Sequence, residues 1–300
     1  MEQLHPAAWS DAQYARPTLT ASPRRGYSDN MFRRLFCFLG LLLCLVQIAH
    51  AAPPRRIVSL SPGTTEMLFA LGLGRFVVGD TVYCDYPPAA KAVTKVGDVN
   101  TSYEKVLALR PDLIVADAVA NGRAVVRLTQ LHQPILAVSP TSLPAVEASL
   151  RQIGARTGTG RQAEVVIARM EHKARQAALL AAADKRPRPR VLIVVQASPL
   201  WTAGAGTFLD DLVTRAGGVN VGTAVRGYGT FSREQVLTHP PDVVLGDAAV
   251  QAAFRADPLL GRLAAVRAGR FYALPGDLTS RPGPRLADGL LLVARALHSR

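Results

Sequence analysis

The residue types that most often carry out chemistry in proteins are present in this chain, but their spacing forms no known catalytic group. Downstream of residue 51, the histidines are His132, His172, His239 and His298. None of them has a carboxylate partner at a spacing typical of general acid–base catalysis. The sequence also contains no Gly-x-Ser-x-Gly, His-Glu-x-x-His, Cys-x-x-Cys or phosphate-loop pattern. We therefore expect no catalytic residues and no metal ligands, and we expect that the chain is not an enzyme.

Two shorter segments match reactive patterns only in part. Gly204-Ala205-Gly206 lacks the third glycine that a dinucleotide-binding loop needs. Cys84 precedes Asp85, and a neighbouring negative charge makes a thiol less acidic and therefore less reactive. We expect no cofactor at the glycine segment and an inert cysteine.

Four segments are candidates for the walls of a binding cleft, and the first three of them carry aromatic side chains. These segments are Tyr83–Pro88, Ser198–Gly204, Arg226–Phe231 and Leu274–Arg281. Only 6% of the residues are aromatic, so their grouping in loops favours a broad, flat and partly apolar ligand. We expect Tyr83, Trp201 and Tyr228 to face that ligand. We expect Tyr86 and Phe231 to pack against the halves of the protein that carry them.

An internal repeat indicates how these segments are positioned. Segments 103–117 and 233–247 share a glutamate, a Val-Leu pair, a Pro-Asp pair, an apolar run and a closing aspartate. Ser102 and Ser232 can each cap a short helix, and the proline ends that helix. The apolar runs that follow indicate buried strands of parallel sheets.

A looser repetition precedes each of these segments. Arg56–Pro62 and Arg190–Pro199 both indicate a strand that enters a loop, and each leads to a helical stretch that ends in glycine. Between the two halves, residues 161–184 contain no proline or glycine and carry an apolar stripe. This segment predicts one helix about 36 Å long, which the proline-rich segment 186–190 ends.

Together these elements predict an α/β protein with two Rossmann-like lobes, each with a parallel central sheet, joined by a single long rigid helix. We assign residues 1–51 to a leader, 52–158 to the N-terminal lobe, 159–185 to the connecting helix and 186–300 to the C-terminal lobe. A ligand would bind in the cleft between the lobes, where loops at the carboxyl ends of the strands meet.

The N-terminal segment predicts export. Met31–Arg34 is basic, Leu35–Ile48 is almost wholly apolar, and Ala49-His50-Ala51 is a small-x-small cleavage pattern. This order is that of a cleaved secretory signal, and the apolar run is shorter than the roughly 20 residues of a membrane-spanning helix. We expect Met31 to be the true start. We expect a soluble periplasmic protein, not a lipoprotein, whose one remaining cysteine is Cys84.

The composition excludes two other classes of protein. Apolar residues make up 49% of the chain and charged residues 19%, which is typical of a protein with a packed core and not of a disordered one. The formal charge is +13, but apart from segment 186–190 the basic residues are scattered along the chain. Nucleic-acid binding needs basic residues gathered on one element, so we expect no nucleic-acid partner.

With these features in place, the chain resembles a known family. Two lobes and a single connecting helix are similar to the periplasmic binding proteins with a helical backbone, also called class III, which serve ABC importers of cobalamin, haem and iron–siderophores. The segments most similar to the vitamin B12 (cobalamin)-binding members are Arg56–Glu66, Tyr83–Pro88, Glu104–Ala116 and Phe231–Val236. The resemblance runs from Arg56 to Ala296 and is weak between residues 118 and 185. It implies a receptor that delivers a cobalamin-type corrinoid to an inner-membrane permease and ATPase complex.

The resemblance also implies which residues contact the ligand. Tyr83 matches a tyrosine that lines the corrin site, and Gly63 lies in a loop that approaches the ligand. Trp201 matches an aromatic residue of the second lobe, and Tyr228 stands where the family has a tryptophan. The remaining predicted contacts form one loop, which comprises Asp277, Leu278, Thr279, Ser280 and Arg281.

The chain departs from the family pattern at several positions. Val99, Asp117 and Leu278 stand where family members carry cleft tryptophans, and a cysteine pair of the second lobe is absent. Because the cleft has fewer aromatic residues than in the family, the identity of the transported ligand stays open. The alternatives are the same fold binding haem or a ferric siderophore and, less favoured, an envelope α/β enzyme.

Each alternative cargo has its own requirement. Haem needs an axial ligand, for which Tyr83 or Tyr228 could serve. Anionic siderophores need clustered arginines, and only Arg226 and Arg281 lie near the candidate loops.

Two glutamates occupy equivalent positions of the repeat. Glu104 and Glu234 each lie in a predicted first helical turn, where the helix dipole stabilises an anion. They match acidic residues of the family, one on each lobe, that form ion pairs with arginines of the permease. The resemblance therefore implies that both glutamates dock the receptor on its importer.

Overall fold

The computed structural model describes residues 52–98, 100–279 and 281–298, and every structural statement below refers to them. The predicted leader 1–51 lies outside the described residues, as do Val99 and Ser280, and only the backbone of Thr279 is described. The chain divides into two units, Met1–Ala52 and Pro53–Arg300, and the fold is that of the second. Within the described part of the chain, none of the helices combines the length and hydrophobicity that crossing a bilayer requires.

The first lobe is built on a parallel sheet. Its elements are β1 (Ile57–Ser59), α2 (Pro62–Ala70), β2 (Val77–Gly79), α3 (Tyr103–Ala108), β3 (Leu113–Asp117), α4 (Gly122–Gln130), β4 (Ile135–Val138) and α5 (Leu143–Thr157), with 3₁₀ helices at Gly74–Phe76 and Pro88–Ala92. The strand order is β2-β1-β3-β4, and every pairing is parallel. Every residue of β3 is buried, as expected for a central strand with helices on both faces.

The second lobe combines parallel and antiparallel strands. Its elements are β5 (Arg190–Gln196), β6 (Trp201–Ala203), α7 (Phe208–Arg215), β7 (Val219–Asn220), β8 (Tyr228–Thr230), α8 (Arg233–Thr238), β9 (Val243–Gly246), α9 (Ala248–Ala256), α10 (Ala264–Arg267), β10 (Phe271–Ala273), α11 (Gly276–Thr279) and α12 (Leu286–His298), with a 3₁₀ helix at Leu260–Arg262. The order is β10-β9-β5-β6-β8, and β7 also pairs with β5. Strands β10, β9, β5 and β7 are parallel, whereas β6 and β8 are antiparallel.

The antiparallel strands correct one expectation from the sequence. Ser198–Gly204 and Arg226–Phe231 were predicted to be loops, but they contain β6 and β8. Only a short segment, Ala197–Leu200, joins β5 to β6, and so short a connection allows antiparallel pairing but no parallel crossover.

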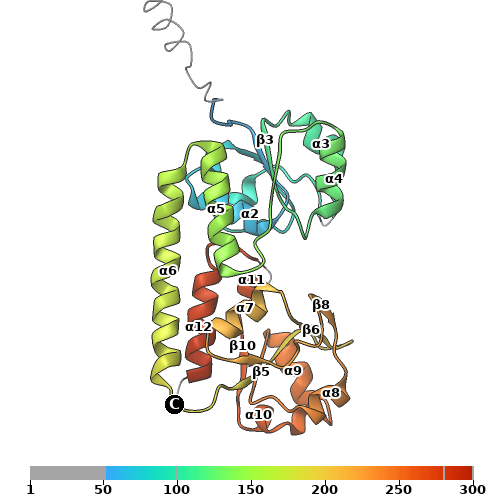
Figure 1. Cartoon of the computed structure of the whole chain (residues 1–300). Helices are drawn as coiled ribbons and strands as arrows, with labels where there is room; N and C mark the ends of the chain where they lie inside the picture. Colours follow the sequence, from blue (N-terminus) through green and yellow to red (C-terminus); the bar gives the residue numbers. More distant parts are fainter. Residues whose placement is uncertain (1–51, 99, 280, 299–300) are drawn as a thin grey trace, which may run out of the picture. The chain divides into compact units, whose positions relative to one another are not determined.

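The long helix α6 (Gly160–Ala183) lies along the side of both lobes, and a second helix, α12, lies beside it at the second lobe (Figure 1). Helix α6 is the helix predicted at residues 161–184. Lys173 of α6 and Asp288 of α12 form an ion pair of 2.5 Å.

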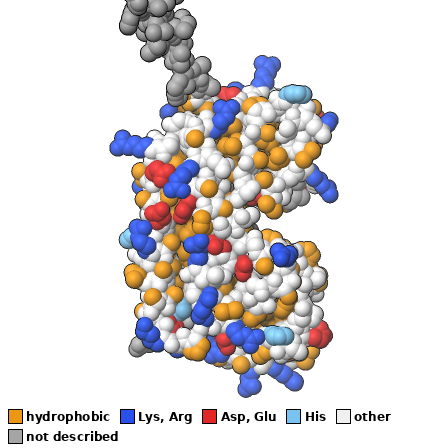
Figure 2. Space-filling view, in the orientation of Figure 1, with side chains coloured by type: hydrophobic (Ala, Val, Ile, Leu, Met, Phe, Trp, Pro, Cys, Tyr) orange, Lys and Arg blue, Asp and Glu red, His pale blue; other side chains and the backbone are white. Residues whose placement is uncertain are grey.

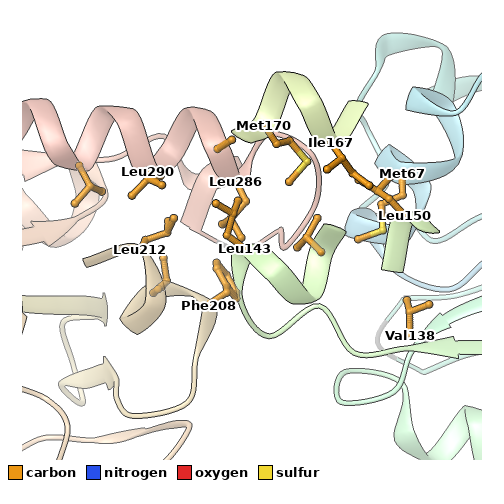
Figure 3. Close-up of a cluster of buried hydrophobic side chains, with 14 of the residues drawn as sticks. Met67, Val138, Leu143, Leu150, Ile167, Met170, Phe208, Leu212, Leu286 and Leu290 are labelled. Atoms are coloured by element: carbon orange, nitrogen blue, oxygen red, sulfur yellow. The ribbon is translucent and has the colours of Figure 1, made fainter. Parts of the chain in front are cut away.

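The hydrophobic core runs from one lobe into the other (Figure 3). Met67 of α2 and Leu150 of α5 belong to the first lobe, and Leu212 of α7 belongs to the second. Side chains of α6 and α12, such as Ile167 and Leu290, pack between them in the same buried cluster. One buried cluster therefore spans both lobes, in addition to a separate cluster within each lobe, and it holds them together more firmly than a flexible linker would.

The internal repeat of the sequence is present in the structure. Ser102 caps α3 and Ser232 caps α8, each by accepting a hydrogen bond from a backbone N–H three residues later. Both helices are followed by the predicted buried strands, β3 and β9. Local capping chemistry and the apolar runs therefore fix the same helix–strand unit in both lobes.

Candidate ligand-binding cleft

A cavity of about 510 Å³ lies between the two lobes. Figure 2 shows the surface hollowed between them, on the side away from α6. The lining residues are Asp117, Val119, Ala120, Pro140, Thr141, Val195, Gly206, Thr207, Phe208, Gly227, Tyr228 and Pro282. Asp117 ends β3, and Val195 lies near the end of β5. The cavity therefore opens at the carboxyl ends of strands, where α/β folds commonly bind ligands.

Asp117 forms part of the first-lobe wall of this cavity. Its Oδ1 accepts hydrogen bonds from the backbone N–H groups of Val119 at 2.9 Å and Ala120 at 3.1 Å. Asn121 stabilises this turn through two more hydrogen bonds. Its side-chain oxygen accepts from the Asp117 N–H, and its side-chain N–H₂ donates to the Leu60 carbonyl. Burial raises the pKa of the Asp117 carboxyl, against the lowering effect of the two backbone N–H groups.

Tyr228 and Phe208 form the aromatic wall of the second lobe. Their ring centroids lie 6.5 Å apart at an interplanar angle of 57°. The Tyr228 ring is 45% exposed, so a large face remains open to a ligand. The surrounding lobes desolvate its hydroxyl, and this burial, together with the charge of Asp117, raises the pKa of Tyr228.

A network of charged side chains joins helix α2, the segment after β2 and the segment 277–285. Arg285 donates to both oxygens of Glu66, at 2.6 and 3.0 Å, and also forms an ion pair with Asp277. Arg281 forms an ion pair with Asp85 and lies 4.0 Å from Glu66. Burial raises the pKa of Glu66, against the lowering effect of Arg285, whereas the Arg281 hydrogen bond lowers the pKa of Asp85. Two of the predicted ligand contacts, Asp277 and Arg281, are therefore engaged with protein groups.

Gly63 and Leu278 have packing roles in this structure. Gly63 is buried at the start of α2, and a Cβ at this position would lie 2.6 Å from the Pro282 carbonyl oxygen. The glycine therefore permits a close approach of two backbone segments. Leu278 is 7% exposed and lies in α11 against Gly289 of α12. Neither residue lines the 510 Å³ cavity.

The structure does not bring Tyr83 and Trp201 into the wall of that cavity. Tyr83 is 50% exposed in the segment after β2, and Trp201 is 38% exposed at the start of β6. Strand β6 pairs with β8, where Ala203 lies opposite Tyr228. Trp201 therefore lies near the aromatic wall along the same pair of strands, without being part of it.

The expectations for the other two aromatic residues have different outcomes. Phe231 is buried in the core of its own lobe, as predicted. The prediction for Tyr86 is wrong, because its ring is 42% exposed and stacks under the Arg285 guanidinium at 3.7 Å. That cation–π contact depends on a residue far along the chain, which no local pattern indicates.

Sequence analysis missed two main features of the cavity. Phe208 was read only as the start of a helix, which Thr207 caps by accepting from the Asp210 N–H at 3.1 Å. Asp117 was noted as the closing aspartate of the repeat and as a position where the family has a tryptophan, but not as a ligand contact. Its position as the closing residue of a buried strand was a signal that it would lie at the carboxyl edge of the sheet.

Glu104 and Glu234 lie in the first turns of α3 and α8, and both are exposed. Their own backbone N–H groups, helped by Ser102 and Ser232, lower the pKa of each carboxyl. In Figure 1, α3 and α8 both lie on the side away from α6, one on each lobe. The helices that carry these two exposed glutamates therefore lie on the same side of the protein, one on each lobe.

The buried thiol of Cys84 is held by two hydroxyl groups. The Thr65 hydroxyl donates to Sγ at 3.2 Å, and Thr81 lies at the same distance. Burial raises the pKa of Cys84, which disfavours the reactive thiolate.

The fold and the interlobe cleft define a binding protein, and comparison with known proteins agrees. The chain belongs to the periplasmic binding protein family, whose model matches residues 57–278. It is 31% identical, over 82% of this chain and 80% of the other, to a Bacillus subtilis protein described as the uncharacterized ABC transporter substrate-binding lipoprotein YvrC. It is 34% identical to the vitamin B12-binding protein of Salmonella choleraesuis, over 72% of this chain and 79% of that protein.

A solved structure of a different receptor is similar as well. A periplasmic heme binding protein from Pseudomonas aeruginosa superimposes with a TM-score of 0.74 and 30% identity, covering 82% of this chain and 93% of that one. Relatives with two kinds of cargo are therefore comparably similar to this chain, and membership of the family leaves the ligand open.

Proposed function

We propose that this protein is exported by a cleaved signal peptide and works in the periplasm as the receptor of an ABC importer. It captures a cobalamin-type corrinoid in the interlobe cleft and delivers it to the permease and ATPase complex of the inner membrane. It carries out no reaction on its ligand. The similarity to a vitamin B12-binding protein supports a corrinoid as the ligand. One property of the cavity favours a corrinoid over haem or a siderophore.

That property is the charge of the cavity wall. Among the described residues, the lining includes the carboxylate of Asp117 and no lysine, arginine or histidine. Haem carries two propionates and many siderophores are anionic, so their receptors need cationic partners. The corrin ring carries uncharged amide groups at its rim, which need hydrogen-bonding partners but no cation. The cavity wall therefore fits a corrin ring, with uncharged amide groups at its rim, better than haem, with its carboxylate groups.

The tyrosines also favour the corrinoid. A tyrosine that ligates haem iron does so as a phenolate. Burial and the charge of Asp117 raise the pKa of Tyr228, so a phenolate at this position would form only through the charge of the bound iron itself. Tyr83, the other predicted candidate, does not line the cavity.

Haem remains the second candidate because the Pseudomonas heme binding protein has the same fold at 30% identity. Titration of purified residues 52–300 with cyanocobalamin and, separately, with haemin distinguishes the two. Trp201 is the one tryptophan after residue 51 and serves as the fluorescent reporter, with calorimetry as the second readout. We expect saturable one-to-one binding of cyanocobalamin. Saturable haemin binding with a shifted Soret band, and no heat with cyanocobalamin, would overturn the proposal.

A further inference from the structure

Only half of the Asp117 carboxylate is used by the protein. Its Oδ1 accepts the two backbone hydrogen bonds from Val119 and Ala120. Among the described residues, both hydrogen bonds to the side chain go to Oδ1 and none to Oδ2, and the side chain, 6% exposed, lines the cavity. An acceptor that faces a cavity without a protein partner is available to a donor that a ligand brings.

We propose that Asp117 is a selectivity residue of the cleft: its Oδ2 accepts a hydrogen bond from an amide N–H at the rim of the corrinoid and repels a carboxylate at that position. This inference rests on the proposed function. The aromatic wall of Tyr228 and Phe208 contacts the flat part of a ligand regardless of its rim. Asp117 instead distinguishes amide from acid, two groups of nearly the same shape.

The fold offers an isosteric test and a matched control. Asp117→Asn keeps an oxygen that accepts from Val119 and Ala120, and it replaces Oδ2 with an N–H₂ donor. Asp247 is the equivalent residue of the repeat, caps α9 through the Val250 N–H at 2.8 Å, and does not line the interlobe cavity. Asp247→Asn therefore makes the same chemical change at a helix cap outside the site.

The experiment compares cyanocobalamin with its monocarboxylic acids, in which one propionamide of the corrin rim is hydrolysed. We expect wild type to prefer the amide, and Asp117→Asn to reduce that preference about tenfold, mainly by gaining affinity for at least one acid isomer, because the N–H₂ group can donate to a carboxylate and also to the oxygen of a rim amide. Asp247→Asn should bind both ligands as wild type does. An unchanged amide-to-acid ratio in Asp117→Asn would overturn the role of Asp117. Failure of wild type to bind any of these corrinoids would instead overturn the proposed function.

A second, independent observation concerns the surface that carries the two glutamates. Leu107 follows Glu104 by three residues and is 37% exposed, and Leu237 follows Glu234 by three residues and is 44% exposed. Residues three apart lie on one face of a helix. A single exposed leucine on a protein surface is common. Here, however, the internal repeat places an exposed leucine beside the glutamate of each lobe.

The geometry points to these leucines as the apolar contacts of the surface that meets the permease. The glutamates would steer the encounter and set its register, whereas the leucines, once covered, would slow dissociation. The partner must offer two equivalent sites, each with a cation beside an apolar pocket. This proposal also rests on the proposed function.

The test measures dissociation of the receptor from its permease complex in lipid nanodiscs, for Leu107→Ala, Leu237→Ala and the double variant. Leu179→Ala is the control, because Leu179 is 70% exposed on α6, which lies on the other side of the molecule. We expect the double variant to dissociate about tenfold faster, with unchanged corrinoid affinity and melting temperature. A double variant that dissociates like Leu179→Ala would refute the role of the leucines. Charge reversal of both glutamates is measured in parallel. If that variant no longer docks, the surface does meet the permease, and a negative result for the leucines then concerns the leucines alone.

Discussion

The guanidinium of Arg285 lies 3.7 Å from the centre of the Tyr86 ring while it forms an ion pair with the buried Glu66. Tyr86 and Glu66 belong to the first lobe, whereas Arg285 immediately precedes α12, which packs along α6 beside the second lobe. One side chain therefore connects the loop after β2, helix α2 and the last helix of the chain.

Removal of this side chain should destabilise the protein. Arg285→Ala leaves the Glu66 carboxylate, 3% exposed, without its main partner, and we expect a loss of about 3 kcal/mol in the free energy of unfolding. Urea unfolding followed by circular dichroism measures the change. Arg151→Ala, which breaks the exposed pair with Glu164, is the control and should have little effect. Equal midpoints for the two variants would contradict the connecting role of Arg285.

Asp80 should make stability depend on pH. Its Oδ1 accepts from Lys95 at 2.6 Å, Oδ2 has no partner among the described residues, and burial raises its pKa from 3.8 to about 6. The folded protein binds the proton of Asp80 more tightly than the unfolded chain does, so protonation of Asp80 stabilises the fold. This stabilisation is fully present below the pKa that Asp80 has in the unfolded chain, and it is lost as the pH rises through about 6. We expect this group to lower the free energy of unfolding by about 2 kcal/mol between pH 4 and pH 7.

The measurement is a series of urea unfolding curves across that pH range for wild type and Asp80→Asn. The asparagine has the same shape and does not titrate, so the variant should lack this part of the pH dependence. Identical pH dependence in both proteins would show that Asp80 does not titrate as its surroundings indicate.

The close approach at Gly63 predicts a steric penalty. Gly63→Ala would place a Cβ 2.6 Å from the Pro282 carbonyl oxygen, and relief of this overlap should cost about 1–3 kcal/mol. Gly122→Ala is the matched control in the same lobe, because no atom lies within 4 Å of its added Cβ. Thermal melting compares the two, and a Gly63→Ala protein as stable as Gly122→Ala would refute the packing role.

Tyr228 should contribute to ligand affinity through its ring and not through its hydroxyl. We expect Tyr228→Ala to weaken cyanocobalamin binding by about tenfold, since the open aromatic face is lost. Tyr228→Phe keeps the ring against Phe208 and should bind within about twofold of wild type. Calorimetric titration tests both variants, and a large loss in Tyr228→Phe would point to a hydroxyl contact instead.

Charge reversal at Glu104 and Glu234 should separate docking from binding. Both carboxylates are exposed and their pKa values are lowered, so they remain negative throughout the neutral range. The double change Glu104→Lys and Glu234→Lys should abolish corrinoid uptake in cells and leave binding by the purified receptor unchanged. Uptake at the wild-type rate would show that these residues do not dock the receptor.

Sequence patterns predicted the features that depend on local chemistry. The caps at Ser102 and Ser232, the strands that follow and the long helix α6 all depend on neighbours within a few residues. The antiparallel strands β6 and β8 were missed because their pairing depends on the turn at residues 197–200. Local patterns therefore identified the lobes better than the edge of the second sheet.

The site was harder to predict because its residues meet across long separations. Arg281 pairs with Asp85, 196 positions earlier in the chain, and Arg285 pairs with Glu66, 219 positions earlier. Resemblance placed Arg281 beside the ligand, but it carries no information on such partners. Asp117 was predictable as a residue at the strand end, whereas its unpaired oxygen became evident only from the fold.

The buried cluster that runs from Met67 to Leu290 limits how such receptors can be recombined. A chimera that joins one lobe of this chain to the opposite lobe of a relative would cut through the buried cluster that spans both lobes. Helices α5, α6, α7 and α12 would have to be exchanged as a set, because their side chains fill one another's spaces. The lobes are repeated in sequence, but they are not interchangeable modules.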